Sequence, residues 1–155
     1  MTMDYRKAKK NDIEVLIELR KKMLREVNKL DDGYEFSAGL LENSRQYFLE
    51  GDQTTVLAFD GDKAVACASI SYIGIMPTFS HPTGKRAHIM NVWTDPAYRG
   101  RGNARKLVNR LIAEAKERGV TEIGLDATDA GRPLYESLGF KGSVEYMVLN
   151  TGKQE

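Results

Sequence analysis

The chain has little of several features that define large protein classes. It holds one cysteine in 155 residues, Cys67, which excludes an internal disulfide and a cysteine-rich metal site. Its formal net charge is +1, whereas general nucleic-acid binders are usually strongly basic. No apolar stretch approaches the roughly twenty residues of a membrane helix, and the start of the chain lacks the apolar core of a signal peptide. We therefore expect a cytoplasmic protein that binds neither nucleic acid nor membrane.

What is present is the composition of an ordinary globular domain. Hydrophobic residues make up 41% of the chain and charged residues 29%, a balance typical of proteins with a packed core. A length of 155 residues is close to the common size of one domain. We expect residues 1–155 to form a single domain.

The first half of the chain alternates between strand and helix signals. Asn11, followed by Glu14 three residues later, has the pattern of a capping box, and Arg20 interrupts the apolar stripe of the helix that follows. The turn Asp60-Gly61-Asp62 separates two runs rich in β-formers, which indicates a hairpin. The elements predicted here are a strand at 5–8, a helix from the capping box to about Lys29, a helix over 40–48 that ends before Gly51, and strands at 54–59 and 63–75.

The second half contains a loop, two strands and the clearest helix of the chain. After Gly102, apolar residues recur at helical spacing, and Gly119 stands where a left-handed residue commonly ends a helix. The elements predicted here are a loop at 76–85, a strand at 87–93, the helix between these two glycines, a strand at 121–127, a short helix at 133–138, and one or two strands over 140–149.

A glycine-rich turn before that helix is the most informative feature. Gly100 and Gly102 remove the side chains that would hold a ligand away from the backbone. The N–H groups of a first helical turn have no partner in the helix, and the helix dipole adds roughly half a positive charge there, which suits a phosphate. Five cations and no acid fall within twelve positions: Arg99, Arg101, Arg105, Lys106 and Arg110. The turn predicts a site for a phosphorylated cofactor, the alternative being a solvated basic helix face.

Two motifs occur in the order and spacing of one known family. The run Arg99-Gly100-Arg101-Gly102-Asn103-Ala104 fits the pattern Arg/Gln-x-x-Gly-x-Gly/Ala. The run Leu134-Tyr135-Glu136-Ser137-Leu138-Gly139-Phe140 fits Leu-Tyr-x-x-x-Gly-Phe, and the expected helix and strand lie between the two. On these motifs the chain resembles the Gcn5-related N-acetyltransferase (GNAT) family, chiefly over residues 54–149.

The resemblance implies an α+β fold in three layers, with a mixed, mostly antiparallel sheet that is splayed at its centre and has helices on both faces. It implies acetyl-CoA as the acetyl donor and no metal, and it leaves a homodimer open. The backbone N–H groups of Arg99 to Ala104 would hold the pyrophosphate, and the strand at Val92, Trp93 and Thr94 would pair with the pantetheine arm. Thr128, where many relatives carry an asparagine, is a further candidate contact to that arm.

Acyl transfer to an amine needs a base for the amine, donors for an oxyanion and a proton for the departing thiolate. The resemblance implies Tyr135 as the acid, since a phenol of pKa near ~10 matches a thiolate in basicity; a packed tyrosine is the alternative. His88 lies where histone-acetylating members place a glutamate base, and imidazole titrates near neutrality; a water chain or a structural histidine is the alternative. The resemblance also implies a backbone N–H near Val92 as the oxyanion donor.

Three other features are weaker candidates. We interpret Cys67 as a packing residue of an apolar strand, the alternative being an acetyl carrier in a ping-pong scheme. His81 is expected to face solvent from its loop. Between Asp31 and Asp52, six acidic residues accompany one basic residue, Arg45, which favours either a cationic acceptor or an ordinary solvated surface.

The function predicted is direct transfer of an acetyl group from acetyl-CoA to a primary amine of a small molecule or peptide, in a ternary complex. The alternative that keeps the same site is a noncatalytic acyl-CoA-binding sensor. A dinucleotide-binding oxidoreductase is disfavoured, because Arg105 stands where Gly-x-Gly-x-x-Gly requires its third glycine.

Overall fold

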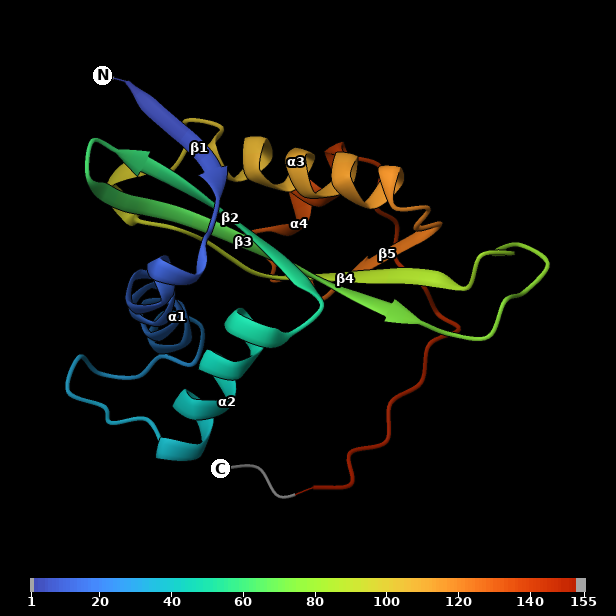
Figure 1. Cartoon of the computed structure of the whole chain (residues 1–155), viewed down its shortest axis with the longest axis horizontal. Helices are drawn as coiled ribbons and strands as arrows, with labels where there is room; N and C mark the ends of the chain where they lie inside the picture. The colour runs from blue at the N-terminus through green and yellow to red at the C-terminus, as the bar shows by residue number, and fades with distance from the viewer. Residues whose placement is uncertain (1, 153–155) are drawn as a thin grey trace.

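A mixed sheet of five strands forms the centre of the computed structural model, which describes residues 2–152 (Figure 1). The strands, in their order across the sheet, are β1 (Met3–Lys7), β2 (Gln53–Asp60), β3 (Lys63–Gly74), β4 (Lys85–Thr94) and β5 (Glu122–Leu125). Neighbours from β1 to β4 pair antiparallel, whereas β4 and β5 pair in parallel. The predicted class, an α+β fold with a mostly antiparallel mixed sheet, is confirmed.

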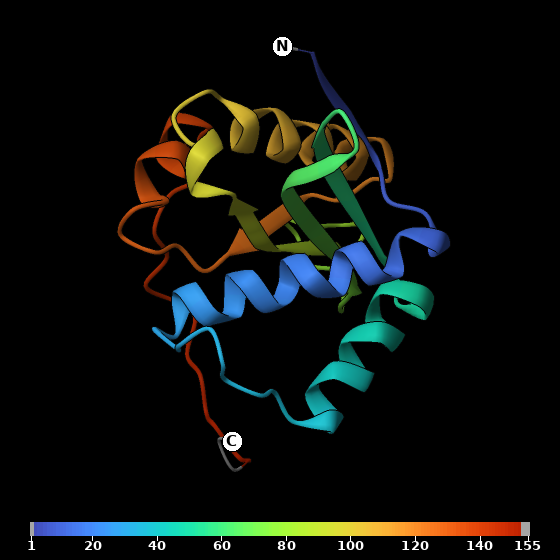
Figure 2. The ribbon, with the colours of Figure 1, turned by 90° about the vertical axis from the view of Figure 1, so that its left-hand side faces the viewer.

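Helices cover both faces of the sheet, as the two views in Figures 1 and 2 show. One face carries α1 (Ile13–Val27) and α2 (Ala38–Glu50), and the other carries α3 (Asn103–Glu117) and α4 (Arg132–Ser137). Short 3-10 turns at Lys10–Asp12 and Pro96–Tyr98 lead into α1 and toward α3.

Each face of the sheet has its own apolar core, which the alternation along β2 makes visible. Val56 and Ala58 pack in the core shared with Leu107 of α3, whereas Leu57 packs in the core shared with α1 and α2. Because both faces are covered, the centre of β2 is buried at every position and its sequence is a continuous apolar run.

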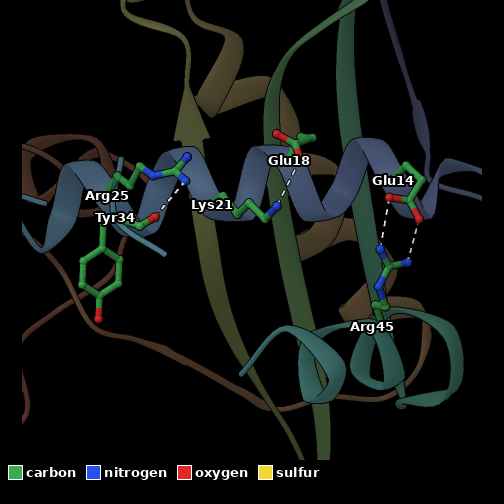
Figure 3. A network of polar contacts seen from close by, with 6 residues as sticks. All are labelled: Glu14, Glu18, Lys21, Arg25, Tyr34 and Arg45. Atoms are coloured by element: carbon green, nitrogen blue, oxygen red, sulfur yellow. Dashed lines mark hydrogen bonds and ion pairs between the residues drawn. The ribbon is translucent and has the colours of Figure 1, made fainter. Parts of the chain in front are cut away.

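Exposed polar contacts join α1 to its neighbours (Figure 3). Arg45 of α2 donates to both carboxylate oxygens of Glu14 at 2.7 and 3.1 Å, and Arg25 donates to the Tyr34 carbonyl at 3.2 Å. Exposed pairs of this kind contribute only about 0–1 kcal/mol each. The position of α2 therefore depends mainly on the apolar core, where Phe48 is buried.

A bulge in β4 opens the centre of the sheet. Asn91 and Val92 stand opposite the single residue Ala68 of β3, and Asn91 adopts a left-handed backbone with φ of 58°, which asparagine tolerates better than most residues. Just before the bulge, the parallel ladder to β5 ends at the pair Ile89 and Leu125. Leu125 is also the last residue of β5, so β4 continues past Ile89 without a strand on that side, as the predicted splay requires.

Several local predictions are confirmed by hydrogen bonds. The hairpin turn lies between Asp60 and Lys63, with Gly61 at φ of 60°. Gly119 ends α3 at φ of 79°, where its N–H donates to the Lys116 carbonyl at 3.1 Å. The Val120 N–H donates to the Ala115 carbonyl at 3.0 Å, which completes a Schellman motif.

Two predictions are wrong. The stretch 140–149 forms no strand: the segment leaves the sheet and runs toward the C-terminus (Figure 1), and Val144, Tyr146, Met147, Val148 and Leu149 are between 69% and 99% exposed. The helix also does not begin at an Asn11 capping box. Asp12 is the residue that precedes α1, and its carboxylate accepts the Lys9 N–H at 2.7 Å.

We predict that Asp12→Asn destabilises the fold by about 1–3 kcal/mol at neutral pH. Arg6 donates to both Asp12 oxygens at 2.8 and 2.9 Å, and this bond holds the pKa of the carboxyl below its usual value. Because the pKa of this carboxyl is lower in the folded than in the unfolded state, its ionised form stabilises the fold. This contribution is fully present above about pH 4 and is lost as the pH falls through the folded-state pKa.

The measurement is urea unfolding at pH 7 and near pH 3. The difference between wild type and Asp12→Asn should shrink at the lower pH, while Asp4→Asn, an exposed carboxylate of β1, should change little at either. An equal loss of unfolding free energy at both pH values would show that the charge of Asp12 contributes nothing to stability.

Candidate active site

The start of α3 forms an open cradle of backbone N–H groups. Gly102 precedes the helix with φ of 82°, and Gly100 has φ of 76°. A Cβ built on either glycine meets no atom within 4 Å, so both face open space. The first helical bond runs from the Lys106 N–H to the Gly102 carbonyl at 3.1 Å, which leaves the N–H groups of the first turn available to an anion.

Side chains around the cradle hold it in place. The buried Asn103 accepts the Tyr5 hydroxyl of β1 at 2.5 Å and donates to the Tyr98 carbonyl at 3.2 Å. Its amide is therefore engaged within the protein, and its contribution to a ligand would come from the backbone. A hollow of about 510 Å³ adjoins this point; it is lined by Thr2, Met3, Tyr5, Arg101, Asn103 and Lys106.

The five basic side chains near the cradle contact different parts of the fold. Arg99 donates to both oxygens of Glu26 in α1 at 2.7 and 2.8 Å and to the Thr94 carbonyl at 2.8 Å. Arg105 reaches across to Ser137 of α4 at 2.9 Å. The other contacts are Arg101 over the Tyr98 ring, Lys106 over the Tyr5 ring, and Arg110 to the Tyr5 carbonyl. Arg101 and Lys106 thus add positive charge at the hollow beside the cradle, whereas Arg99 is paired with Glu26 and Arg105 faces α4.

The candidate residues of β4 lie beside the cradle on the segment that diverges from β5. Val92 packs toward the α3 core, and Trp93 is buried in the core of α1 and α2. Thr94 pairs with Ala66 of β3. Beyond the last pair with β5, the backbone of this segment has a side on which an extended ligand could add hydrogen bonds.

Tyr135 and Thr128 lie on and before α4, across the splay. The ring of Tyr135 packs edge-on against Phe140, and partial burial raises the pKa of its phenol. The Thr128 hydroxyl accepts the Gly131 N–H at 3.1 Å and so closes the turn before α4. A Cβ on Gly131 would lie 3.0 Å from a carbon of the Tyr135 ring, so a larger residue at position 131 would crowd this ring.

His88 lies on β4 ahead of the bulge. It stands opposite Ser71 and Gly124, and its Nε2 is 3.6 Å from the exposed carboxylate of Asp126. Its neighbours Ala87 and Ile89 belong to the α3 core, so the imidazole is on the face of α1 and α2.

That same face contains a cavity that the sequence did not reveal. It has a volume of about 180 Å³ and is lined by Arg20, Asn43, Ser44, Tyr47, Phe48, Met90 and Asn91. The Tyr47 hydroxyl is 2.7 Å from that of Ser71, the residue opposite His88. No carboxylate belongs to this lining, although the prediction placed an acidic stretch there. The one available signal was Arg20, a cation within an apolar helical stripe.

Two other residues have structural contacts. Cys67 is fully buried, its thiol donates to the Asn91 carbonyl at 3.3 Å, and burial raises its pKa to about 12; a thiol of that pKa is a poor acetyl carrier. His81 does not simply face solvent: its ring is 2.9 Å from the Thr121 hydroxyl and 3.2 Å from the Glu122 carboxylate. These contacts connect the loop before β4 to β5.

Within residues 2–152, no group of three or more His, Cys, Asp or Glu side chains is arranged to hold a metal ion. No helix in that part of the chain is long and apolar enough to cross a bilayer.

The cradle and the splayed strand agree with the result of comparison with protein families. The acetyltransferase (GNAT) family matches the chain over residues 20–140. The chain belongs to this family. The predicted resemblance is confirmed, and the GNAT match begins upstream of both motifs, within α1.

Two solved structures and one further relative illustrate the similarity. A predicted acetyltransferase from Clostridium acetobutylicum, crystallised with acetyl-CoA, is 34% identical with a TM-score of 0.84, and 96% of each chain is covered. A GCN5-related N-acetyltransferase from Ralstonia eutropha JMP134 is 30% identical with a TM-score of 0.79, covering 97% of this chain and 100% of that one. The glucosamine 6-phosphate N-acetyltransferase of Trypanosoma brucei brucei is 33% identical over 76 residues, 49% of this chain and 52% of that protein. The chain spans about half the length of this last relative.

Proposed function

We propose that this GNAT chain, as a single domain over residues 1–155 in the cytoplasm, transfers an acetyl group from acetyl-CoA directly to a primary amine. The acceptor would be a small molecule or peptide, bound together with the donor in a ternary complex. The observation that carries the proposal is the adjacency of two open backbone surfaces, the α3 cradle and the diverging part of β4. One suits a pyrophosphate and the other suits an extended amide-containing arm.

The residues present fit acetyl-CoA by their chemistry. The N–H groups of Asn103, Ala104 and Arg105 start the helix, and the glycines at 100 and 102 leave the approach to them open. Val92 to Thr94 would pair with the pantetheine arm, and Thr128 lies across the splay from them. When bound, acetyl-CoA supplies a thioester whose acyl carbon is open to attack by an amine.

Protons would be handled by two side chains from opposite sides of the splay. The partly buried Tyr135 retains its phenolic proton at neutral pH and would donate it to the departing sulfur. His88, on the face of the α1 and α2 cavity, would accept the amine proton directly or through water. A backbone N–H near Val92, next to the bulge, would stabilise the oxyanion.

The cavity between α1, α2 and the β4 bulge, which we call the acceptor-side cavity, limits the size of the amine that can bind there. A volume of about 180 Å³ accommodates a small group rather than a whole folded substrate. The Trypanosoma brucei brucei relative is named for an amino sugar phosphate, which supports testing amino sugars beside amino acids, polyamines and peptide N-termini.

We predict that Gly102→Ala weakens CoA binding at least about ten-fold, because the added methyl group projects into the open cradle while the left-handed backbone is strained by about 1–2 kcal/mol. Gly61→Ala is the matched control, since Gly61 also has a positive φ and free space around it but lies in a distant hairpin. Calorimetric titration with CoA compares the two variants with wild type. Equal affinity in Gly102→Ala and wild type would place the ligand elsewhere.

Wild type is expected to release thiol from acetyl-CoA only when a suitable amine is added, and Tyr135→Phe should lower kcat about 10²-fold or more with little change in acetyl-CoA affinity. Tyr146→Phe, an exposed tyrosine, serves as the control. Thiol release and product mass report the reaction. Binding without amine-dependent release would indicate a noncatalytic acyl-CoA-binding protein, and an unchanged kcat in Tyr135→Phe would remove that residue from the mechanism.

His88→Ala should lower kcat/KM about 10²-fold at neutral pH, because the amine would lose its proton acceptor. His81→Ala controls for general effects, because these are the two histidines of the chain. An unchanged kcat/KM in His88→Ala would remove His88 from the mechanism.

A further inference from the structure

Arg20 is a half-buried cation on the side of α1 that faces the sheet. It follows Leu16, Ile17 and Leu19, which are buried in the core beneath the sheet. Its Nη1 atom lies 3.3 Å from the Asn91 side-chain oxygen and 3.9 Å from the Met23 sulfur. None of the ion pairs found within residues 2–152 includes Arg20.

An arginine in this environment is costly unless an anion approaches it. The titratable groups that act on it from the strand and from α2 are Cys67 and Tyr47, and both are neutral at pH 7 because burial raises the pKa of each. A guanidinium has five N–H donors, and the two long contacts above occupy few of them. Removing part of such a charge from water without a counter-charge is unfavourable, and an anion in the cavity would offset this cost.

The guanidinium also lies at a functional position. Arg20 lines the cavity of about 180 Å³ together with Met90 and Asn91 of the β4 bulge. Val92, the next residue along β4, begins the segment assigned above to the donor. Ser44 and Asn43 of α2 provide further polar groups in the lining. A group bound by Arg20 would therefore lie close to an amine that attacks at the bulge.

We propose that the acceptor amine carries an anionic group, a phosphate or a carboxylate, and that Arg20 binds this group in the cavity between α1, α2 and the β4 bulge. The identity of the acceptor rests on the proposed acetyl transfer, whereas the anion site itself does not. The acceptor class is then an amino sugar phosphate or an amino acid rather than a polyamine, whose charges are all positive.

The test compares amines with and without the anion: glucosamine 6-phosphate with glucosamine, and alanine with alaninamide. Wild type should have a kcat/KM at least about ten-fold higher for the anionic member of one pair, and which pair responds distinguishes phosphate from carboxylate.

Arg20→Gln keeps a donor for Asn91 but removes the charge. It should lower kcat/KM for the anionic amine about ten-fold more than for the neutral one, through KM, and Arg20→Lys should restore part of the preference. Arg45→Gln, an exposed arginine of α2, should leave the preference as in wild type.

An equal loss for both members of each pair in Arg20→Gln would overturn the proposal and would leave Arg20 as a support for Asn91. A wild-type preference for the neutral amines would overturn it as well. If no amine is acetylated, calorimetric titration of the same four compounds in the presence of CoA separates the two proposals. If an anionic compound binds to wild type but not to Arg20→Gln, the anion site is supported although the proposed acetyl transfer is not. If no anionic compound binds, the anion site is rejected.

Discussion

The break between β4 and β5 is the constraint on which the rest of this GNAT site depends. The parallel ladder ends at Ile89 and Leu125, and the next residues of β4 form a bulge around a left-handed Asn91. The bulge changes which residues face each side: Ala87 and Ile89 face the α3 core before it, and Val92 faces that core after it. The bulge thereby brings Asn91 into the lining of the cavity beside Met90, and β4 continues past its last pair with β5; we propose these two features as the acceptor and donor sides of the site.

The distortion is held by polar contacts within an apolar core. The Cys67 thiol donates to the Asn91 carbonyl, and the Asn91 side chain contacts both Arg20 and Ser69. Such a network fixes a single backbone conformation because its groups would otherwise be buried without partners. Cys67 therefore stabilises the bulge by its packing and its weak hydrogen bond. Arg20 contacts Asn91 of the bulge and also lines the cavity.

Local chemistry explains which features were predictable from the sequence. The hairpin at Gly61, the end of α3 at Gly119 and the cradle at Gly102 each depend on a backbone conformation that glycine adopts easily, so a few adjacent residues determine them. Contacts between distant residues could not be predicted in this way. Arg99 lies 73 positions from Glu26, and of the five cations clustered in sequence, Arg101 and Lys106 line the hollow beside the cradle while Arg99 and Arg105 contact other helices. The apolar stretch at 144–149 has strand propensity, but a strand also requires a neighbour, which propensity alone does not specify.

The most direct test of the account is the response of backbone amides to CoA in ¹⁵N-labelled protein, followed by NMR. If the α3 cradle and this part of β4 form one donor site, the amide resonances of Asn103, Ala104 and Arg105 will shift together with those of Val92, Trp93 and Thr94, with saturation at one stoichiometric equivalent. Shifts confined to other parts of the chain, or none at millimolar CoA, would contradict the claim that the α3 cradle and the diverging strand form one donor site.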